Sequence, residues 1–270
     1  MNSPKSSKSK YSFRFYTTTY KNAEFGRYAH LHLRIVLVLD GILEMNIGDS
    51  HYEIPSGCGV FIPSLLPHSF SSGRENTFRI LEFSREYLDG AFSFAKGMTV
   101  TRHIFGYSEV VRQALREYVS FSGFCDDEAR IGAVLAPLAY EIREQCEMSA
   151  SFTDTSMLSR ILGYVEEKFS EPTDLATVGA ALGLHPASVS RIISKSTGGT
   201  FNNYLRHVRC TYAAKQINLG DMTFSEIAYA SGFGSIRSFN RAFLAEYSMT
   251  PSEYRDTLAK NAPAATKGVK

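Results

Sequence analysis

The sequence lacks the cysteine pairs that mark metal ribbons, redox centres and disulfide frameworks. Its four cysteines, at positions 58, 125, 146 and 210, form no Cys-x-x-Cys motif. Long apolar runs are missing too: the longest aliphatic run, at 35–39, has five residues, whereas a membrane span needs roughly 20. No apolar segment follows the Lys-rich start, so no secretory signal is visible. We therefore expect a chain that does not span a membrane, is not exported and works in the reducing cytoplasm.

Motifs for common enzyme chemistry are also missing. There is no Walker loop, no Gly-x-Gly-x-x-Gly fingerprint and no Gly-x-Ser-x-Gly elbow. With 44% hydrophobic and 21% charged residues, the composition is that of an ordinary globular protein. We expect no enzymatic activity and no cofactor.

The pattern of residue types divides the chain into segments. Short branched and aromatic runs cut by turn residues predict a β-rich front, and apolar residues recur at helical spacing after Arg85. The predicted divisions are a flexible basic arm at 1–10, a β-rich domain at 11–105, a helical pair at 106–150, a linker at 151–156, an all-helical domain at 157–260 and a disordered tail at 261–270. The front half is acidic, so any nucleic-acid contacts are expected on particular helices of the back half.

An internal repeat runs through the back half. The stretch 178–184 aligns with 227–233, 188–193 with 238–243, and 200–204 with 250–254. Each copy reads as a helix, a glycine turn and a second helix, which is the helix-turn-helix arrangement, at about 173–197 and 223–247. Gly183 and Gly232 stand at the turns, Ser235 is a good N-cap, and Thr223 has capping-box spacing to Glu226.

The second helix of each copy has a polar face. In the first copy and then the second, the outward residues are predicted to be Ala187, Ser188, Ser190 and Arg191, and Ser235, Arg237, Ser238, Asn240 and Arg241. Arginine can donate two hydrogen bonds to guanine and asparagine can read adenine. An ordinary helical hairpin would explain one such pattern. Two copies, joined by a helical stretch at 201–218, favour two DNA readers about one helical turn of DNA apart.

At these residues the sequence resembles the AraC/XylS family of bacterial transcription regulators. The resemblance covers about 157–257, with its core in the stretches 224–233 and 239–243 and in Met-Thr-Pro-Ser-Glu-Tyr-Arg at 249–255. It implies two helix-turn-helix units that enter successive major-groove segments, with the outward residues above at the family's base-reading positions.

Three departures from the family pattern stand out. His185 replaces the usual serine before the first recognition helix, which predicts a weaker cap. Ser194, and Leu244 with Ala245, stand where basic residues are usual, which predicts fewer phosphate contacts. Ser248 replaces a glycine where a left-handed turn is expected.

The front half resembles, less specifically, the cupin-like sensor domain of the same family. The matching pieces are 36–41, Pro55-x-Gly57, Phe61-Ile-Pro63, Pro67-His68 and 81–84. This implies a small β-barrel that binds an effector, followed by helices for dimerisation. The alternative for the two helices in 106–150 is that they cover the sheet.

Histidines 30, 32 and 68 invite a metal interpretation, and three imidazoles could hold zinc. Catalytic cupins also need a carboxylate soon after the histidine pair, and this chain has aliphatic residues there. We therefore expect no metal at these histidines. Structural histidines are the plainer alternative.

The remaining interpretation of these histidines is effector binding. Alternation on a strand would place His30, His32 and Arg34 on one face. The candidate effector-binding residues are His32, Arg34, His68 and Arg79. A buried arginine needs a partner. Either a carboxylate of the chain, from Glu44, Glu53 or Glu82, reaches Arg34, or an anionic effector does.

Together these patterns predict an α+β multidomain fold: an N-terminal cupin-like β-barrel with a helical dimerisation pair, and a C-terminal all-α domain with two helix-turn-helix units. The predicted function is an effector-controlled, sequence-specific transcription activator that binds double-stranded DNA as a homodimer and contacts RNA polymerase, with no membrane partner. The alternatives are a cupin-type metalloenzyme fused to a DNA-binding domain and a structural nucleoid-type binder.

Overall fold

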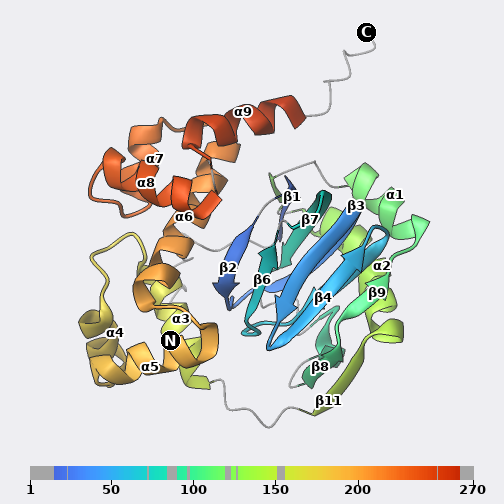
Figure 1. The fold of residues 1–270 in the computed structure, drawn as a ribbon, viewed down its shortest axis with the longest axis horizontal. Helices are drawn as coiled ribbons and strands as arrows, with labels where there is room; N and C mark the ends of the chain where they lie inside the picture. Colours follow the sequence, from blue (N-terminus) through green and yellow to red (C-terminus); the bar gives the residue numbers. More distant parts are fainter. Residues whose placement is uncertain are drawn as a thin grey trace, which may run out of the picture.

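The computed structural model places a β-sandwich beside an all-helical domain (Figure 1). It describes residues 15–22, 24–71, 73–83, 90–95, 98–118, 123–125, 127–150, 156–247 and 249–261. The predicted arm at 1–10, the linker residues 151–155, the tail residues 262–270 and the turn at Ser248 lie outside the described residues. In the described ranges, no helix combines the length and the apolar character that crossing a membrane requires.

Nine of the described strands form one hydrogen-bonded set, and two more form a separate ribbon. The set contains β1 (Phe15–Lys21), β2 (Phe25–Tyr28), β3 (Leu33–Ile47), β4 (Ser50–Pro55), β5 (Cys58–Ile62), β6 (His68–Ser71), β7 (Asn76–Phe83), β9 (Ile104–Gly106) and β10 (Gly123–Cys125). The ribbon pairs β8 (Met98–Arg102) with β11 (Glu147–Ala150), and a short 3-10 helix, η2 (Ser93–Ala95), precedes β8.

Strand β3 belongs to both layers of the sandwich. Its first half pairs with β5 and β7, and its second half pairs with β4 and β6. The register shifts between Val38 and Asp40, and Gly41 follows at φ +72° with the Glu75 carbonyl so close that a Cβ would collide with it. The main path of strands ends at β10 and β9, so the cupin-like barrel is open rather than closed.

Helices α1 (Glu109–Tyr118) and α2 (Glu128–Gln145) cover one face of this sheet. Their apolar stripes share one buried cluster with Leu33 and Leu37 of β3 and with Leu81 of β7. The segment 106–150 also supplies β10 and β11, and the apolar stripes of both helices pack on the sheet, while dimerisation through this segment stays a prediction.

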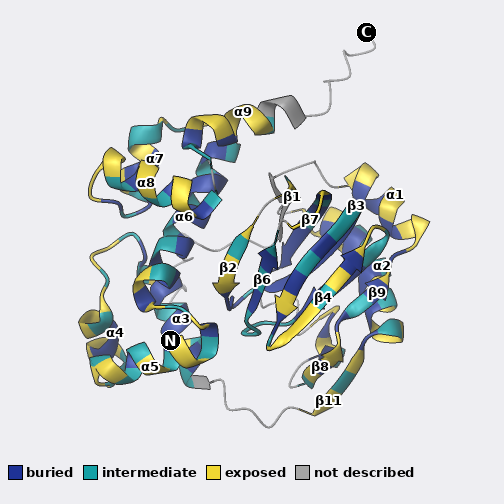
Figure 2. Cartoon of the chain, viewed as in Figure 1, coloured by how far each residue is buried: buried dark blue, intermediate teal, exposed yellow. Residues whose placement is uncertain are grey.

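The helical domain contains the two predicted helix pairs and three further helices. Its elements are α3 (Ser156–Lys168), α4 (Leu175–Leu182), α5 (Pro186–Thr197), α6 (Phe201–Leu219), α7 (Phe224–Ala230), α8 (Ile236–Tyr247) and α9 (Pro251–Asn261). One apolar cluster packs α4 and α5 against α3 and the first part of α6, and a second packs α7, α8 and α9 against the rest of α6. Helix α6 therefore joins the two pairs and is buried along most of its length (Figure 2).

The local signals read from the sequence are confirmed at the helix ends. Gly183 ends α4 in the left-handed region at φ +69°, and Gly232 has φ +81° in the second turn. Thr223 and Glu226 form the predicted capping box, and Ser235 Oγ accepts a hydrogen bond from the Ser238 amide. His185 does cap α5, through its Nδ1, which accepts from the Ala187 amide at 3.3 Å.

The two turn glycines predict a graded loss of stability. Replacing Gly183 with Ala places a side chain in the left-handed region with open space around it, at a cost of roughly 1–2 kcal/mol. Gly232→Ala carries the same backbone cost, and its Cβ would also lie 2.6 Å from the Phe169 carbonyl oxygen, which adds roughly 1–3 kcal/mol of overpacking. Denaturant unfolding measures both, and equal losses would contradict this packing of the second turn against Phe169, the residue that follows α3.

Candidate functional site

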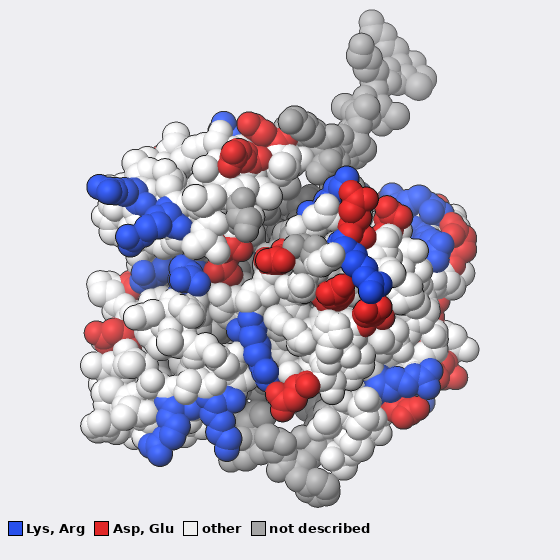
Figure 3. All heavy atoms as spheres, viewed as in Figure 1, with Lys and Arg blue, Asp and Glu red and all other residues white. Residues whose placement is uncertain are grey.

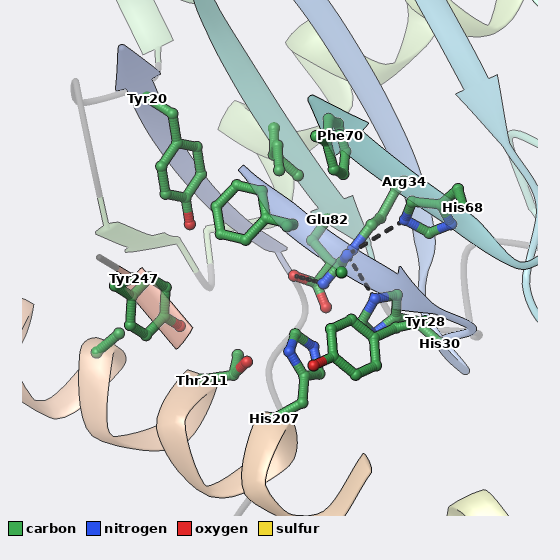
Figure 4. A pocket seen from close by; sticks show the side chains of 14 residues that line it. Tyr20, Tyr28, His30, Arg34, His68, Phe70, Glu82, His207, Thr211 and Tyr247 are labelled. Atoms are coloured by element: carbon green, nitrogen blue, oxygen red, sulfur yellow. Dashed lines mark hydrogen bonds and ion pairs between the residues drawn. The ribbon is translucent and has the colours of Figure 1, made fainter. Parts of the chain in front are cut away.

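A pocket lies where the sandwich meets the helical domain (Figure 4). The sandwich contributes Tyr20, Phe25, Gly26, Tyr28, His30, Arg34, His68, Phe70, Ile80 and Glu82, and the helical domain contributes His207, Thr211, Ala214 and Tyr247. The space that water can occupy inside is about 30 Å³, which is enough for one or two water molecules. The pocket has an aromatic end and a charged end, and both domains build it.

Helix α6 presents a buried polar stripe to the sandwich. His207, Thr211 and Lys215 recur every four residues, which places them on one face of the helix, and all three are buried. Burial lowers the pKa of Lys215 to about 8, while the carboxylates of Glu82 and Glu166 act in the opposite direction. Polar groups this deeply buried need partners, and the partners come from the facing sheet.

Arg34 is the centre of the charged end. Its Nη1 donates to His30 Nε2 at 2.6 Å and to His68 Nε2 at 3.4 Å, and its Nη2 lies 3.4 Å from Glu82 Oε2. A carboxylate of the chain therefore reaches Arg34, which is the alternative that requires no anionic ligand. The strand alternation predicted for 30–34 is wrong, because β3 begins only at Leu33 and the residues before it are irregular.

The protonation states at this end follow from burial and charge. Burial lowers the pKa of His68 to about 3 and that of His30 well below its usual value, and the Arg34 charge lowers both further. Burial alone would raise the pKa of Glu82, but Arg34 and Lys215 bring it down to about 2. Two neutral imidazoles and an ionised carboxylate thus surround the guanidinium.

The predicted effector residues separate into two groups. Arg34 and His68 line the pocket, whereas His32 and Arg79 are not among its lining residues. His32 Nε2 lies 3.7 Å from Glu166 Oε2 on α3, at the same domain junction. On β7, Arg79 lies on the opposite face from Ile80 and Glu82, which line the pocket. Its Nε donates to Thr19 Oγ1 at 3.1 Å.

Strand β2 links the pocket to both helix pairs. The Tyr28 ring stacks on His207 at 4.3 Å between centroids, and its hydroxyl donates to Glu246 Oε2 on α8 at 3.5 Å. His207 Nδ1 donates to Glu246 Oε1 at 2.6 Å. At the other pair, the Arg27 side chain lies against Gly198, the residue that ends α5.

The outward faces of α5 and α8 carry the predicted DNA-reading residues. Ala187 and Arg191 of α5 are exposed, as are Arg237, Asn240 and Arg241 of α8. Among the residues that the structure describes, no carboxylate pairs with these three arginines. Lys and Arg atoms gather on the side of the molecule where α8 and α5 lie (Figure 3). Such a surface suits an anionic polymer such as DNA.

The four serines on these faces are less accessible or already bonded. Ser188 and Ser190 are half-buried. Ser238 Oγ donates to the Ser235 carbonyl at 2.8 Å, and Ser235 Oγ accepts from the Ser238 amide at 3.1 Å. Leu244, noted in the sequence where a basic residue is usual, is exposed on α8, and so is Ile236, which the sequence analysis did not select.

Sequence reasoning also missed the helical side of the pocket. It treated 201–218 only as a spacer between the two pairs, although the four-residue spacing of His207, Thr211 and Lys215 was a visible signal. Glu166 and Glu246 were not selected at all. No group of three or more potential ligands in the described ranges could hold a metal ion, the pocket histidines included.

A β-sandwich with a small-molecule pocket, joined to two helix-turn-helix pairs, defines a ligand-binding transcription regulator. Family models agree for both halves: an AraC-like ligand binding domain matches residues 10–117, and a helix-turn-helix domain matches residues 178–257. The chain belongs to the AraC/XylS family of DNA-binding transcription regulators.

Individual relatives match over almost the whole chain. The HTH-type transcriptional activator RhaS of Yersinia pestis is 23% identical over 249 residues, which cover 87% of this chain and 90% of the relative. Among solved structures, ToxT of Vibrio cholerae with a bound unsaturated fatty acid is similar with a TM-score of 0.64 and 15% identity, covering 94% of this chain and 99% of ToxT. Another ToxT crystal form gives a TM-score of 0.63 at 17% identity, with 90% and 98% covered. These structures share the fold.

The buried histidines predict acid sensitivity. The pKa of His68 is about 3 in the folded chain and about 6.5 when unfolded. Below pH 6.5 the unfolded state therefore binds the proton and the folded state does not, so stability falls as the pH drops. At pH 5 this histidine alone lowers the free energy of unfolding by about 2 kcal/mol.

The test compares unfolding free energies between pH 7 and 5 in wild type and His68→Asn. Asparagine can still donate to the Leu66 carbonyl, which His68 Nδ1 contacts at 2.9 Å, but it never charges. Its pH slope should be shallower than that of wild type, and His51→Asn, at an exposed histidine, should keep the wild-type slope. Parallel slopes for His68→Asn and wild type would contradict the assignment.

Proposed function

We propose that this regulator responds to a small effector that binds between the sandwich and helix α6. The observation that carries the proposal is the shared pocket: Arg34 and Glu82 come from the sandwich, and His207 comes from the helix that joins the two DNA-binding pairs. A ligand that changes the contact between sheet and α6 changes the support of both pairs. An effector that bound two arrangements of the sheet and α6 equally well would not shift their populations, so it must bind one arrangement more tightly than the other.

The DNA contacts are proposed from exposure and chemistry. Arg191 of α5 and Arg237, Asn240 and Arg241 of α8 have the side chains that distinguish guanine and adenine, and Ala187 allows close approach. Ser235 and Ser238 act mainly by holding the start of α8, since their hydroxyl groups are bonded there. Ser188 and Ser190 supply secondary contacts from α5.

The wider assignments are also proposals. The protein acts in the cytoplasm as a transcription activator that contacts RNA polymerase, in keeping with relatives named as transcriptional activators. It does so as a homodimer and without enzymatic activity of its own. Because the apolar stripes of α1 and α2 lie on the sheet, a dimer contact through these helices would use what remains exposed: Val110, Tyr118 and Tyr140.

Arg191→Ala and Arg241→Ala test the DNA-binding surface. Each is expected to cost ~1–3 kcal/mol of binding at the preferred site and to relax base choice there. The site is first selected from a random-sequence pool with the wild-type protein, and affinities are measured at one fixed salt concentration.

Arg130→Ala is the matched control for these two changes. Arg130 is an exposed arginine on α2, next to Asp127, and its replacement should leave affinity unchanged. Wild-type affinity in both Arg191→Ala and Arg241→Ala would refute the proposed surface.

A further inference from the structure

Three buried polar atoms on residues that line the pocket have no partner among the described residues: Oε1 of Glu82, Nε2 of His207 and Nε of Arg34. The side chains of Glu82, His207 and Arg34 are 3%, 8% and 9% exposed. Glu82 and His207 line the pocket from opposite domains and point into the space between the sheet and α6 (Figure 4). Buried polar groups without partners are rare and call for an explanation.

The unpartnered Glu82 oxygen is a hydrogen-bond acceptor, and the unpartnered Arg34 Nε–H is a donor. The Glu82 carboxylate stays ionised at neutral pH, because Arg34 and Lys215 hold its pKa at about 2 against the effect of burial. An ionised carboxylate can only accept. His207 already has a partner within the chain, because its Nδ1 hydrogen-bonds Glu246 Oε1. A ligand that satisfies Glu82 and Arg34 must therefore donate one hydrogen bond and accept another, and a hydroxyl group can do both.

Ligand charge is constrained by the same residues. Three of the four N–H groups on the Arg34 Nη atoms donate to His30, His68 and Glu82, and the neutral ligand needs only the N–H on Nε. An anionic ligand would place a second negative charge beside the unpartnered oxygen of Glu82. A cationic ligand would lie beside Arg34, with Lys215 also close enough to interact with Glu82. A neutral donor meets neither repulsion.

We propose that the effector is a neutral molecule with a hydroxyl group that donates to Glu82 Oε1, and with an apolar ring that packs among Tyr20, Phe25, Phe70 and Tyr247. This inference rests on the proposed function, because it names the ligand class of that same pocket. The enclosed space holds only one or two waters. A ring-bearing ligand therefore moves α6 away from the sheet as it enters.

The experiment uses the full-length protein and matched probes. Calorimetry and thermal unfolding are measured with phenol, benzyl alcohol and cyclohexylmethanol, and with the carboxylates benzoate, phenylacetate and cyclohexanecarboxylate. At least one hydroxyl probe is expected to bind saturably and at least tenfold more tightly than every carboxylate. Tighter binding of a carboxylate, or no binding of any probe, overturns the inference.

Two variants locate the binding. Glu82→Gln replaces a charge-assisted hydrogen bond with a neutral one and should weaken the hydroxyl probe about tenfold. Phe25→Leu removes a half-buried ring at the aromatic end of the pocket and should weaken the probe about fivefold, whereas Glu53→Gln, at a half-exposed glutamate on β4, should not. Circular dichroism confirms folding, and Phe25→Leu serves if Glu82→Gln does not fold. Unchanged probe affinity in the folded variants overturns the inference.

Failure of the proposed function would look different. It would appear as DNA binding that is unaffected by changes at Arg191 and Arg241. Carboxylate binding that is weakened in Phe25→Leu would keep the pocket as the effector site and reject only the hydroxyl ligand.

Discussion

The buried ion pair between Arg34 and Glu82 is the interaction on which the rest of the molecule depends. Both charges are buried, so each relies on the other and on the polar stripe of α6 that faces them. Removing one partner of a buried pair typically costs about 3–5 kcal/mol, because the remaining charge is uncompensated. The sandwich and the helical domain are therefore joined through charge as well as apolar packing. A change at this junction therefore affects both domains.

Strand β2 extends that junction to the DNA-binding surface. Tyr28 contacts His207 and Glu246, and Glu246 is the last but one residue of α8, whose outer face carries Arg237 and Arg241. The second recognition helix also reaches the pocket directly, because Tyr247, the last residue of α8, lines it. Burial would raise the pKa of Glu246, but His207 and Arg206 lower it, so the carboxylate in this link is ionised. Effector control needs no long path through the protein.

The parts of the fold that depend on local chemistry could be predicted from the sequence. The duplicated helix pairs, the left-handed glycine at 183 and the capping box at Thr223 all follow from signals within a few residues. The pocket could be predicted only in part, because it combines positions from Tyr20 to Tyr247. Arg34 and His68 were found, but the start of β3 at Leu33 overturned the alternation assumed before it. Which carboxylate reaches Arg34 depends on the pairing of β3 with β7, which no local pattern specifies.

The central claim is that the sandwich controls DNA binding through its contact with α6 and α8. Tyr28→Ala tests it most directly, since Tyr28 belongs to the sandwich and lies at the junction rather than on the outer faces of α5 and α8. The affinity of the full-length protein for its selected DNA site should change at least fivefold, while His51→Ala, at an exposed histidine on β4, should leave it unchanged. Wild-type affinity in a folded Tyr28→Ala protein would contradict the account.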